Sequence, residues 1–190
     1  LGLGYGMGAD KFKQTLKTGS PSVDVSDSVA QQIVMQYRGM YPNIPRLWSG
    51  MKDALFQMIN PRSVGMMYGP LTIKMRALEL PNEMALNYPN LRFEAGQFIY
   101  NTDRDYVRTH GPRVTENVVQ ALSRLVITDQ MLDIQSLPQV DIVLQVHDEI
   151  IAIGSKQDSD ATMNQILEIM RTPPEWCGDL PLDAEGGVSK

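Results

Sequence analysis

The chain has 190 residues and a formal net charge of −5, so composition favours no general attraction to nucleic acid, and any such surface must be a local patch. Cys177 is the only cysteine and there are two histidines, which excludes an internal disulfide and argues against a cysteine-rich or histidine-rich metal site. Charged residues interrupt the apolar stretches well short of the roughly 20 residues that a membrane span requires. Nothing at the start resembles a signal peptide.

The chain opens with LGLGYGMGADK, in which glycine occupies alternate positions. Gly4, Gly6 and Ala9 match a loose form of the dinucleotide-binding fingerprint, but that motif must follow a strand, and too few residues precede it. The spacing from Gly8 to Lys11 does not fit a Walker phosphate loop. A flexible glycine joint remains an alternative to a functional motif. Because Leu1 lies inside a patterned segment, we expect the chain to be part of a longer polypeptide.

Three helices are predicted in the first part of the chain. Residues 9–18 are typical of the remainder of a helix that stops at Gly19, and residues 26–39 have apolar side chains at helical spacing up to Pro42. Pro45 suits the first turn of a third helix. The apolar residues that mark its buried stripe are Leu47, Met51, Leu55 and Met58.

The pattern changes to strands after Gly69. Residues 71–88 predict two strands around a turn at Pro81 and Asn82, and residues 97–109 predict a second hairpin that turns near residues 102–104. A long helix is predicted from about Pro112 to Leu132. The residues of its inward apolar stripe are Val114, Val118, Leu122 and Leu125.

The opposite face of this helix carries a row of polar residues without a carboxylate. Its members are spaced by about one helical turn, and they are Arg113, Asn117, Gln120 and Arg124. An ordinary solvated helix face is one interpretation. The other is a nucleic-acid surface, because arginine, asparagine and glutamine donate hydrogen bonds to phosphates and to acceptors in the DNA grooves.

Residues 140–153 read VDIVLQVHDEIIAI, in which two apolar runs enclose His147, Asp148 and Glu149. This pattern predicts a tight hairpin of two otherwise buried strands with the polar triplet at its tip. An exposed turn is the simpler interpretation, since aspartate is common in turns. Adjacent carboxylates at this position are also suited to Mg²⁺, which is held by one or two carboxylates together with substrate phosphates.

Four segments in a fixed order resemble the C-terminal part of a family A DNA polymerase of the bacteriophage type: LGLGYG, RVTENVVQALSR, QVHDEI and LPLDAEGG. The resemblance covers essentially the whole chain. It implies an α+β fold in which residues 1–70 belong to a helical fingers subdomain, starting inside the nucleotide-binding helix. Residues 71–190 would then be part of the palm, with antiparallel strands and a long packing helix.

The resemblance also implies roles for residues of the opening segment. Leu1 would contact the incoming nucleotide, Tyr5 would lie near the templating base, and Gly6 would let the backbone approach DNA because glycine has no Cβ. Leu1 replaces the aromatic residue that is more common in the family. The family's lysine would lie four residues before Leu1, outside the chain.

In the hairpin, the resemblance implies that Asp148 is a catalytic metal ligand, that Glu149 supports the site, and that His147 contacts the primer terminus. On the long helix, Gln120 matches a residue that contacts the DNA minor groove. The family usually has asparagine four residues before this glutamine, where this chain has Glu116. We assign its role to the adjacent Asn117, and we include Arg113 and Arg124 as further DNA-binding residues of the same row.

The implied reaction is template-directed attack of a primer 3′-hydroxyl on a deoxynucleoside triphosphate (dNTP), with two Mg²⁺ ions. One carboxylate ligand would lie outside the chain, so we expect these residues alone to be inactive. The expected partners are primer-template DNA, dNTP, the missing N-terminal part of the same polypeptide and a processivity factor, with no membrane. The expected location is the cytoplasm of a bacterium or phage-infected cell.

Two alternatives from other classes remain open. A metal-dependent phosphoesterase would use Asp148 and Glu149, with the glycine segment only as a joint, and would require further ligands within the chain. A noncatalytic nucleic-acid-binding module would use the face from Arg113 to Arg124 and would not need Asp148.

Overall fold

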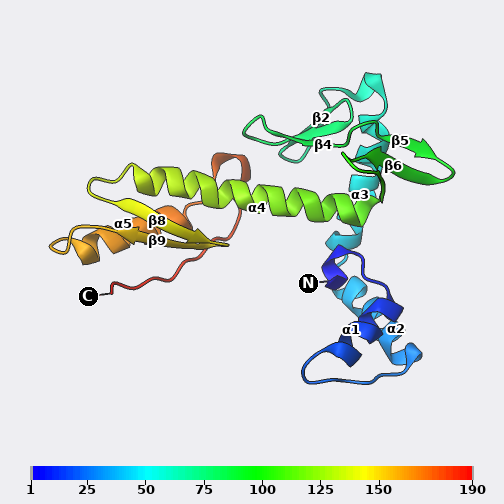
Figure 1. Ribbon diagram of the computed structural model, residues 1–190, viewed down its shortest axis with the longest axis horizontal. Coiled ribbons are helices and arrows are strands. Elements are labelled where there is room, and N and C mark those ends of the chain that lie inside the picture. Colours follow the sequence, from blue (N-terminus) through cyan, green and yellow to red (C-terminus); the bar gives the residue numbers. More distant parts are fainter. Residues whose placement is uncertain (1, 190) are drawn as a thin grey trace. The chain divides into compact units, whose positions relative to one another are not determined.

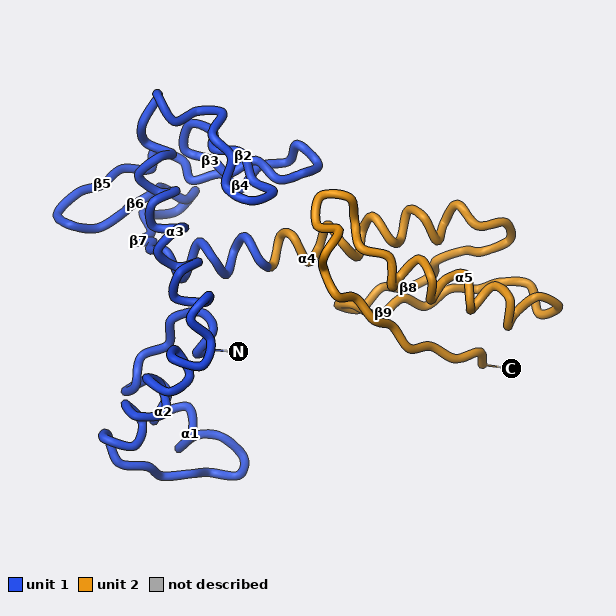
Figure 2. The backbone as a smooth tube through the Cα atoms, turned by 180° about the vertical axis from the view of Figure 1, so that it is seen from behind, with its two compact units in different colours: residues 1–119 blue, residues 120–190 orange. Residues whose placement is uncertain are grey.

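The computed structural model describes residues 2–189 and shows a mixed α and β chain whose sheets are all antiparallel, which confirms the predicted α+β class (Figure 1). The chain forms two compact units, residues 1–119 and 120–190, coloured separately in Figure 2. This division falls inside the longest helix, whereas the predicted boundary between fingers and palm follows residue 70. The polymerase subdomains stay a prediction. Among the described residues, no helix combines the length and apolar character needed to span a bilayer.

The three helices predicted in the first part of the chain are present. α1 (Ala9–Thr18) ends at Gly19, and α2 (Asp27–Met40) begins after Ser26, whose hydroxyl accepts a hydrogen bond from the backbone N–H of Val29 at 3.3 Å. The buried residues of α3 (Asn43–Met58) are Met51, Ala54, Leu55 and Met58, whereas Leu47 is half-buried. Helical spacing therefore located the buried face of α3.

Two small sheets follow α3 in the first unit. The short 3₁₀ helix η2 (Pro61–Ser63) leads into the first sheet, whose strands pair in chain order: β1 (Met67–Tyr68), β2 (Leu71–Lys74), β3 (Ala77–Glu79) and β4 (Ala85–Asn87). The second sheet contains β5 (Arg92–Glu94), β6 (Gln97–Asn101) and β7 (Tyr106–Thr109). Its β6–β7 hairpin turns at residues 102–105, as predicted.

The prediction of two strands in residues 71–88 was wrong, because this segment forms three. β3 and β4 are joined through Pro81 and Asn82 as expected, but a second tight turn at Met75 and Arg76 separates β2 from β3. Arg76 has a φ of 58°, in the left-handed region that glycine or asparagine normally occupies. The sequence has neither glycine nor asparagine at this turn, so it gave no signal that β2 and β3 are separate strands.

The long helix α4 (Gly111–Gln135) confirms the predicted helix and contributes to both units. Val114 and Val118 are buried in the first unit, and Leu125 and Ile134 are buried in the second. At its start, α4 approaches α3 so closely that a Cβ on Gly111 would overlap the backbone carbonyl oxygen of Trp48. Glycine is therefore required here by backbone contact rather than by flexibility.

The second unit contains the C-terminal half of α4, a hairpin and one further helix. The strands are β8 (Asp141–Val146) and β9 (Glu149–Ile153), followed by α5 (Ser159–Arg171) and the short 3₁₀ helix η3 (Glu175–Cys177). The hairpin confirms the prediction for residues 140–153, and α5 was not predicted. Gln130 of α4 is buried and donates a hydrogen bond to the carbonyl oxygen of Met170 at 2.9 Å, which joins α4 to α5.

The contact between Gly111 and Trp48 predicts the effect of adding one methyl group. Gly111→Ala should lower the free energy of unfolding by about 2–3 kcal/mol, because the opposing atom belongs to the backbone and cannot move aside alone. Gly39→Ala in α2 is the matched control, since no atom lies within 4 Å of its added Cβ, and it should be neutral or stabilising by up to about 1 kcal/mol. Chemical unfolding of both variants measures the difference, and equal effects would contradict the close approach.

Candidate functional site

The predicted polar triplet lies at the tip of the β8–β9 hairpin. Val146 and Glu149 are paired across the hairpin, so His147 and Asp148 form a two-residue turn and Glu149 is the first residue of β9. His147 has a φ of 54°, which is the left-handed backbone that the first position of such a turn requires. All three side chains are exposed. The hairpin therefore presents two neighbouring carboxylates and one imidazole to solvent.

The two strands are not buried on both faces, contrary to the expectation from their apolar sequence. Residues paired directly across an antiparallel hairpin share a face, and the pairs Gln145–Ile150 and Ile142–Ala152 are half-buried. The other face carries large apolar side chains that are about half exposed: Leu144 (50%), Val146 (45%), Ile151 (48%) and Ile153 (63%). We call these four residues the exposed hairpin face. The hairpin formed by the two apolar runs thus has one face that is packed and one face that is open to solvent.

Asp148 and Glu149 provide only part of a metal site. Carboxylate oxygens are ligands that Mg²⁺ prefers, and exposed side chains at a turn are accessible to a second molecule. However, no three histidine, cysteine, aspartate or glutamate side chains within residues 2–189 come together closely enough to hold a metal ion. The donor set at the hairpin therefore fits Mg²⁺ only if phosphate oxygens or residues outside this range complete the coordination.

The opening glycine segment forms the 3₁₀ helix η1 (Gly2–Tyr5) and is separate from α1. The helical conformation is interrupted at Gly6, which has a φ of 86°. The helix over residues 9–18 is therefore not a direct continuation of a helix from the opening segment. Leu1, the predicted nucleotide contact, lies outside the described residues. Tyr5 is half-buried.

Side chains of the first unit fix this segment in place. The indole N–H of Trp48 donates to the carbonyl oxygen of Gly4 at 3.0 Å, and the Arg38 guanidinium donates to the carbonyl of Met7 at 3.3 Å while lying 5.4 Å from the centre of the Trp48 rings. A Cβ on Gly6 would lie 2.7 Å from the Cβ of Pro112, at the start of α4. The structure thus brings Gly6 beside α4, and the segment is anchored rather than a free joint.

The residues of the polar row on α4 differ in their surroundings. Arg113 and Asn117 belong to the first unit, and Gln120 and Arg124 belong to the second. Asn117 is half-buried and its amide donates to the hydroxyl of Tyr88 at 3.2 Å. Burial raises the pKa of Tyr88 above its usual value, and the hydrogen bond from Asn117 opposes that shift. Asn117 therefore has a structural role that helical spacing did not reveal.

The two arginines and the glutamine of the row are exposed, but they differ in their contacts. Arg113 donates to the carbonyl of Arg108 at 3.5 Å, which is a weak contact at the limit of hydrogen-bonding distance. Arg124 donates to the side-chain oxygen of Gln145 at 2.5 Å. Gln120 is exposed on the helix and accessible to a second molecule.

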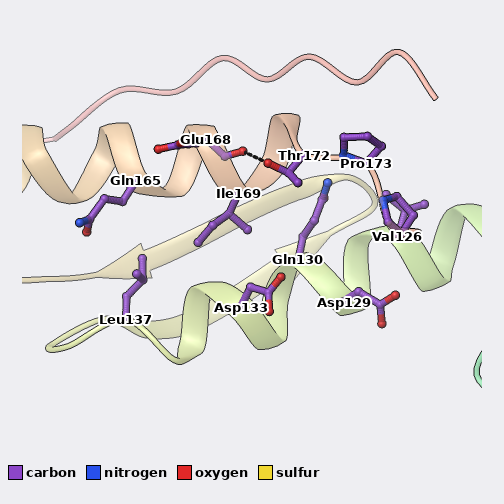
Figure 3. Close-up of a pocket in the computed structure, with 11 residues that line it drawn as sticks. Val126, Asp129, Gln130, Asp133, Leu137, Gln165, Glu168, Ile169, Thr172 and Pro173 are labelled. Carbon is purple, nitrogen blue, oxygen red and sulfur yellow. Dashed lines mark hydrogen bonds between the residues drawn. The ribbon is translucent and has the colours of Figure 1, made fainter. Parts of the chain in front are cut away.

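A pocket of about 400 Å³ lies between α4 and α5 in the second unit (Figure 3). Its carboxylates come from Asp129 and Asp133 of α4 and Glu168 of α5, and its apolar wall includes Ile169 and Pro173. The amino-acid sequence did not reveal this pocket, because α5 was not predicted. The spacing of the two aspartates by one helical turn was the available signal, and an acidic helix face is most often only solvated.

The segment LPLDAEGG near the C-terminus is held to the end of α5. Arg171 donates to the carboxylate of Asp183 at 2.9 Å and to the carbonyl of Ala184 at 2.5 Å. The backbone N–H of Ala184 also donates to the Asp183 carboxylate, and this bond, followed by Arg171, lowers the pKa of Asp183. This local network gives the segment a structural role in the second unit.

Comparison with known proteins identifies one relative of low similarity. The chain is 24% identical over 206 aligned positions to a DNA polymerase of Bacillus phage SP02, and the match covers all of this chain and 31% of the relative. The chain thus spans about a third of the length of the curated relative it matches. No protein-family model matches the chain. No solved structure matches it either.

The comparison supports the resemblance to a bacteriophage DNA polymerase, but not its finer details. The chain is distantly related to part of a phage DNA polymerase, and the relationship extends over its whole length. The assignment to family A and the roles of individual residues stay predictions.

The left-handed backbone at His147 predicts how the turn responds to substitution. His147→Gly and His147→Asn should leave the free energy of unfolding nearly unchanged, because both residues tolerate a positive φ. His147→Val should lower it by about 1–2 kcal/mol, since a β-branched side chain is strained there. Urea unfolding compares the three variants. A glycine variant less stable than the valine variant would contradict the turn geometry.

The hydrogen bond between Asn117 and Tyr88 predicts a coupling between the two residues. In a double-mutant cycle with Asn117→Ala and Tyr88→Phe, the coupling free energy should be about 1 kcal/mol, and strictly additive effects would contradict the bond.

Because burial raises the pKa of Tyr88, its contribution to stability is present below pH 10 and is lost as the pH rises through the folded-state pKa. Tyr88→Phe should remove that part of the alkaline loss.

Proposed function

We propose that this chain is part of a DNA-directed DNA polymerase of family A and that its hairpin tip forms half of the metal-binding site for nucleotidyl transfer. The observation that carries the proposal is the pair of exposed carboxylates, Asp148 and Glu149, at the tip of an ordered hairpin. The relationship to a phage DNA polymerase over the whole chain supports the reaction class.

In the proposed reaction, a primer 3′-hydroxyl attacks the α-phosphate of a dNTP and pyrophosphate leaves. Two bound Mg²⁺ ions would supply charge stabilisation at the attacking and leaving oxygens. Asp148 would hold one or both ions through its carboxylate, and Glu149 would support the same site from the start of β9. His147 would contact the primer terminus from the other position of the turn.

We propose that the DNA and nucleotide surface includes the opening segment and the polar row of α4. Gly6 lies beside Pro112 at the start of α4, so Tyr5 and this end of the helix are close within the first unit. Leu1 would contact the incoming nucleotide. Gln120 is an exposed amide suited to acceptors in the minor groove, with Asn117 and Arg113 in the same row.

Several observations favour a larger polypeptide as the active form. The described residues contain no cluster of three metal-binding side chains, the exposed hairpin face is apolar, and the relative is about three times as long as the matched chain. We propose that the remaining part of the polypeptide supplies the other carboxylate and a lysine for the triphosphate. Isolated, the chain should bind DNA weakly and with strong salt dependence.

The further partners follow from the same proposal. They are primer-template DNA and dNTP as substrates, and a processivity factor as an accessory protein. We propose that the protein that contains this chain acts in the cytoplasm of a bacterium or of a phage-infected cell.

The noncatalytic nucleic-acid-binding module is the second candidate, favoured by the exposure of Gln120 on α4. It predicts that DNA binding survives Asp148→Ala and is lost when Gln120 and Arg124 are changed together. A phosphoesterase confined to this chain is less favoured, because no further ligand side chains join Asp148 and Glu149 within the described residues.

The decisive assay is primer extension by the polypeptide that contains this chain together with its upstream part. Asp148→Asn should lower kcat by at least about 100-fold, because it removes a metal ligand while preserving the size of the side chain. Asp141→Asn is the matched control, since Asp141 is an exposed aspartate at the other end of the same hairpin, and its activity should be within about twofold of wild type.

Two results would contradict the proposal. One is primer extension by the wild-type polypeptide that Asp148→Asn leaves intact, and the other is an absence of extension by the wild-type polypeptide with Mg²⁺ and all four dNTPs. The 190-residue chain alone should show no extension in the same assay.

A further inference from the structure

We propose that Arg124 and Gln145 are positioning residues that hold the hairpin tip, and with it Asp148, at a fixed place along α4. This inference rests on the proposed function for its catalytic consequence, but its structural content can be tested without it. It assigns Arg124 a different role from the DNA contact that the polar row suggested.

The contacts form a continuous connection from the helix to the turn. The Arg124 guanidinium donates to the side-chain oxygen of Gln145 at 2.5 Å, and the side-chain amide of Gln145 donates to the backbone carbonyl of His147. Gln145 uses both ends of its amide, so it is oriented from both sides. A hydrogen bond with a charged donor is stronger than one between neutral groups.

Gln145 can form both hydrogen bonds because successive side chains of β8 point to opposite faces of the hairpin. It is paired with Ile150 on the half-buried face of the hairpin, which is the face that contacts α4 through Arg124. Val146, the next residue, points to the exposed hairpin face. Gln145 is therefore the last side chain on the α4-facing side before the turn that carries Asp148.

A second contact fixes the other end of the strand. The Gln135 side chain near the end of α4 donates to the carbonyl of Val140 at 3.1 Å and accepts from the backbone N–H of Ile142 at 3.2 Å. From Arg124 to Gln135 the helix rises about 16 Å, and from Val140 to Gln145 an extended strand covers about 17 Å. The distance along α4 between Arg124 and Gln135 therefore matches the distance along β8 between their partners. Together the two contacts set the position of β8 along α4.

The hairpin needs these contacts because its other restraints are limited. The pairing of β8 with β9 is irregular between Ile142 and Leu144, which is where the register of the two strands shifts. The side chains of the exposed hairpin face are about half exposed, so packing restrains this face only in part. Without the connection at Gln145, the tip could shift relative to α4 while the base stays bound to Gln135, and Asp148 would move with the tip.

The first test measures amide hydrogen exchange at residues 146–149 in the 190-residue chain. Arg124→Ala and Gln145→Ala should each raise exchange at the tip about fivefold, which is the effect of losing one hydrogen bond, and the double variant should resemble the single variants. Ser123→Ala, an exposed position next to Arg124 on α4, is the control and should change nothing. Unchanged exchange at the tip in Arg124→Ala or Gln145→Ala would overturn the proposal.

Gln145→Glu separates the two bonds of the connection. A carboxylate at residue 145 can still accept from Arg124 but cannot donate to the His147 carbonyl. Exchange at the tip should therefore rise at least as much as in Gln145→Ala. Protection equal to wild type would show that the Arg124 contact alone is enough and would overturn the role of Gln145.

The second test uses primer extension by the polypeptide that also contains the upstream part. Arg124→Ala and Gln145→Ala should lower kcat by about 10–100-fold and raise the Mg²⁺ concentration required, as expected when a ligand is held less firmly. The Kd for primer-template DNA should stay within twofold, and Arg124→Lys should recover part of the activity. Arg104→Ala, an exposed loop arginine, is the control for loss of one positive charge and should be unaffected.

The outcomes separate this inference from the proposed function. Weaker DNA binding with a smaller salt dependence in Arg124→Ala, without a matching effect of Gln145→Ala, would identify Arg124 as a DNA contact and overturn the inference. An absence of extension by the wild-type polypeptide would overturn the proposed function, and hydrogen exchange would still decide whether Arg124 and Gln145 hold the tip.

Discussion

The fold depends on the apolar stripe of α4, because this one helix supplies buried side chains to both compact units. Val114 and Val118 are buried in the first unit, and Leu125 and Ile134 are buried in the second. Each half of the helix also has polar contacts to its own unit, through Asn117 in one and Gln130 in the other. Because the apolar face of α4 is packed against both units, this packing determines which of the polar side chains of the helix are accessible to a ligand.

The hairpin combines an ordered tip with an open apolar face. Pairing of β8 with β9 defines the turn at His147 and Asp148, and side chains of α4 contact the hairpin at both ends of β8. The exposed hairpin face is apolar, which is unusual for a surface in permanent contact with water and favours a covering partner. Two exposed carboxylates beside such a face are consistent with a site completed by another part of a polymerase, as we propose.

The two arginines of the polar row illustrate why equal spacing does not imply equal roles. Arg113 and Arg124 project from the same side of an ideal helix, but Arg113 makes only a weak contact to a backbone carbonyl, and Arg124 binds a glutamine on the neighbouring strand. The difference arises from what lies opposite each residue. A row of donors on one helix is therefore a hypothesis about a surface until its neighbours are known.

The sequence by itself determined the elements whose signals are local. Helical spacing predicted α2, α3 and α4, and two apolar runs around HDE predicted the hairpin with Asp148 at its tip. Only the tertiary structure decided the turn at Arg76, the binding of Asn117 to Tyr88 and the binding of Arg124 to Gln145. These features depend on backbone strain or on residues distant in the chain, which periodicity does not encode. Spacing along one helix or strand fixes which face a side chain occupies, and the elements packed against that face decide what it binds.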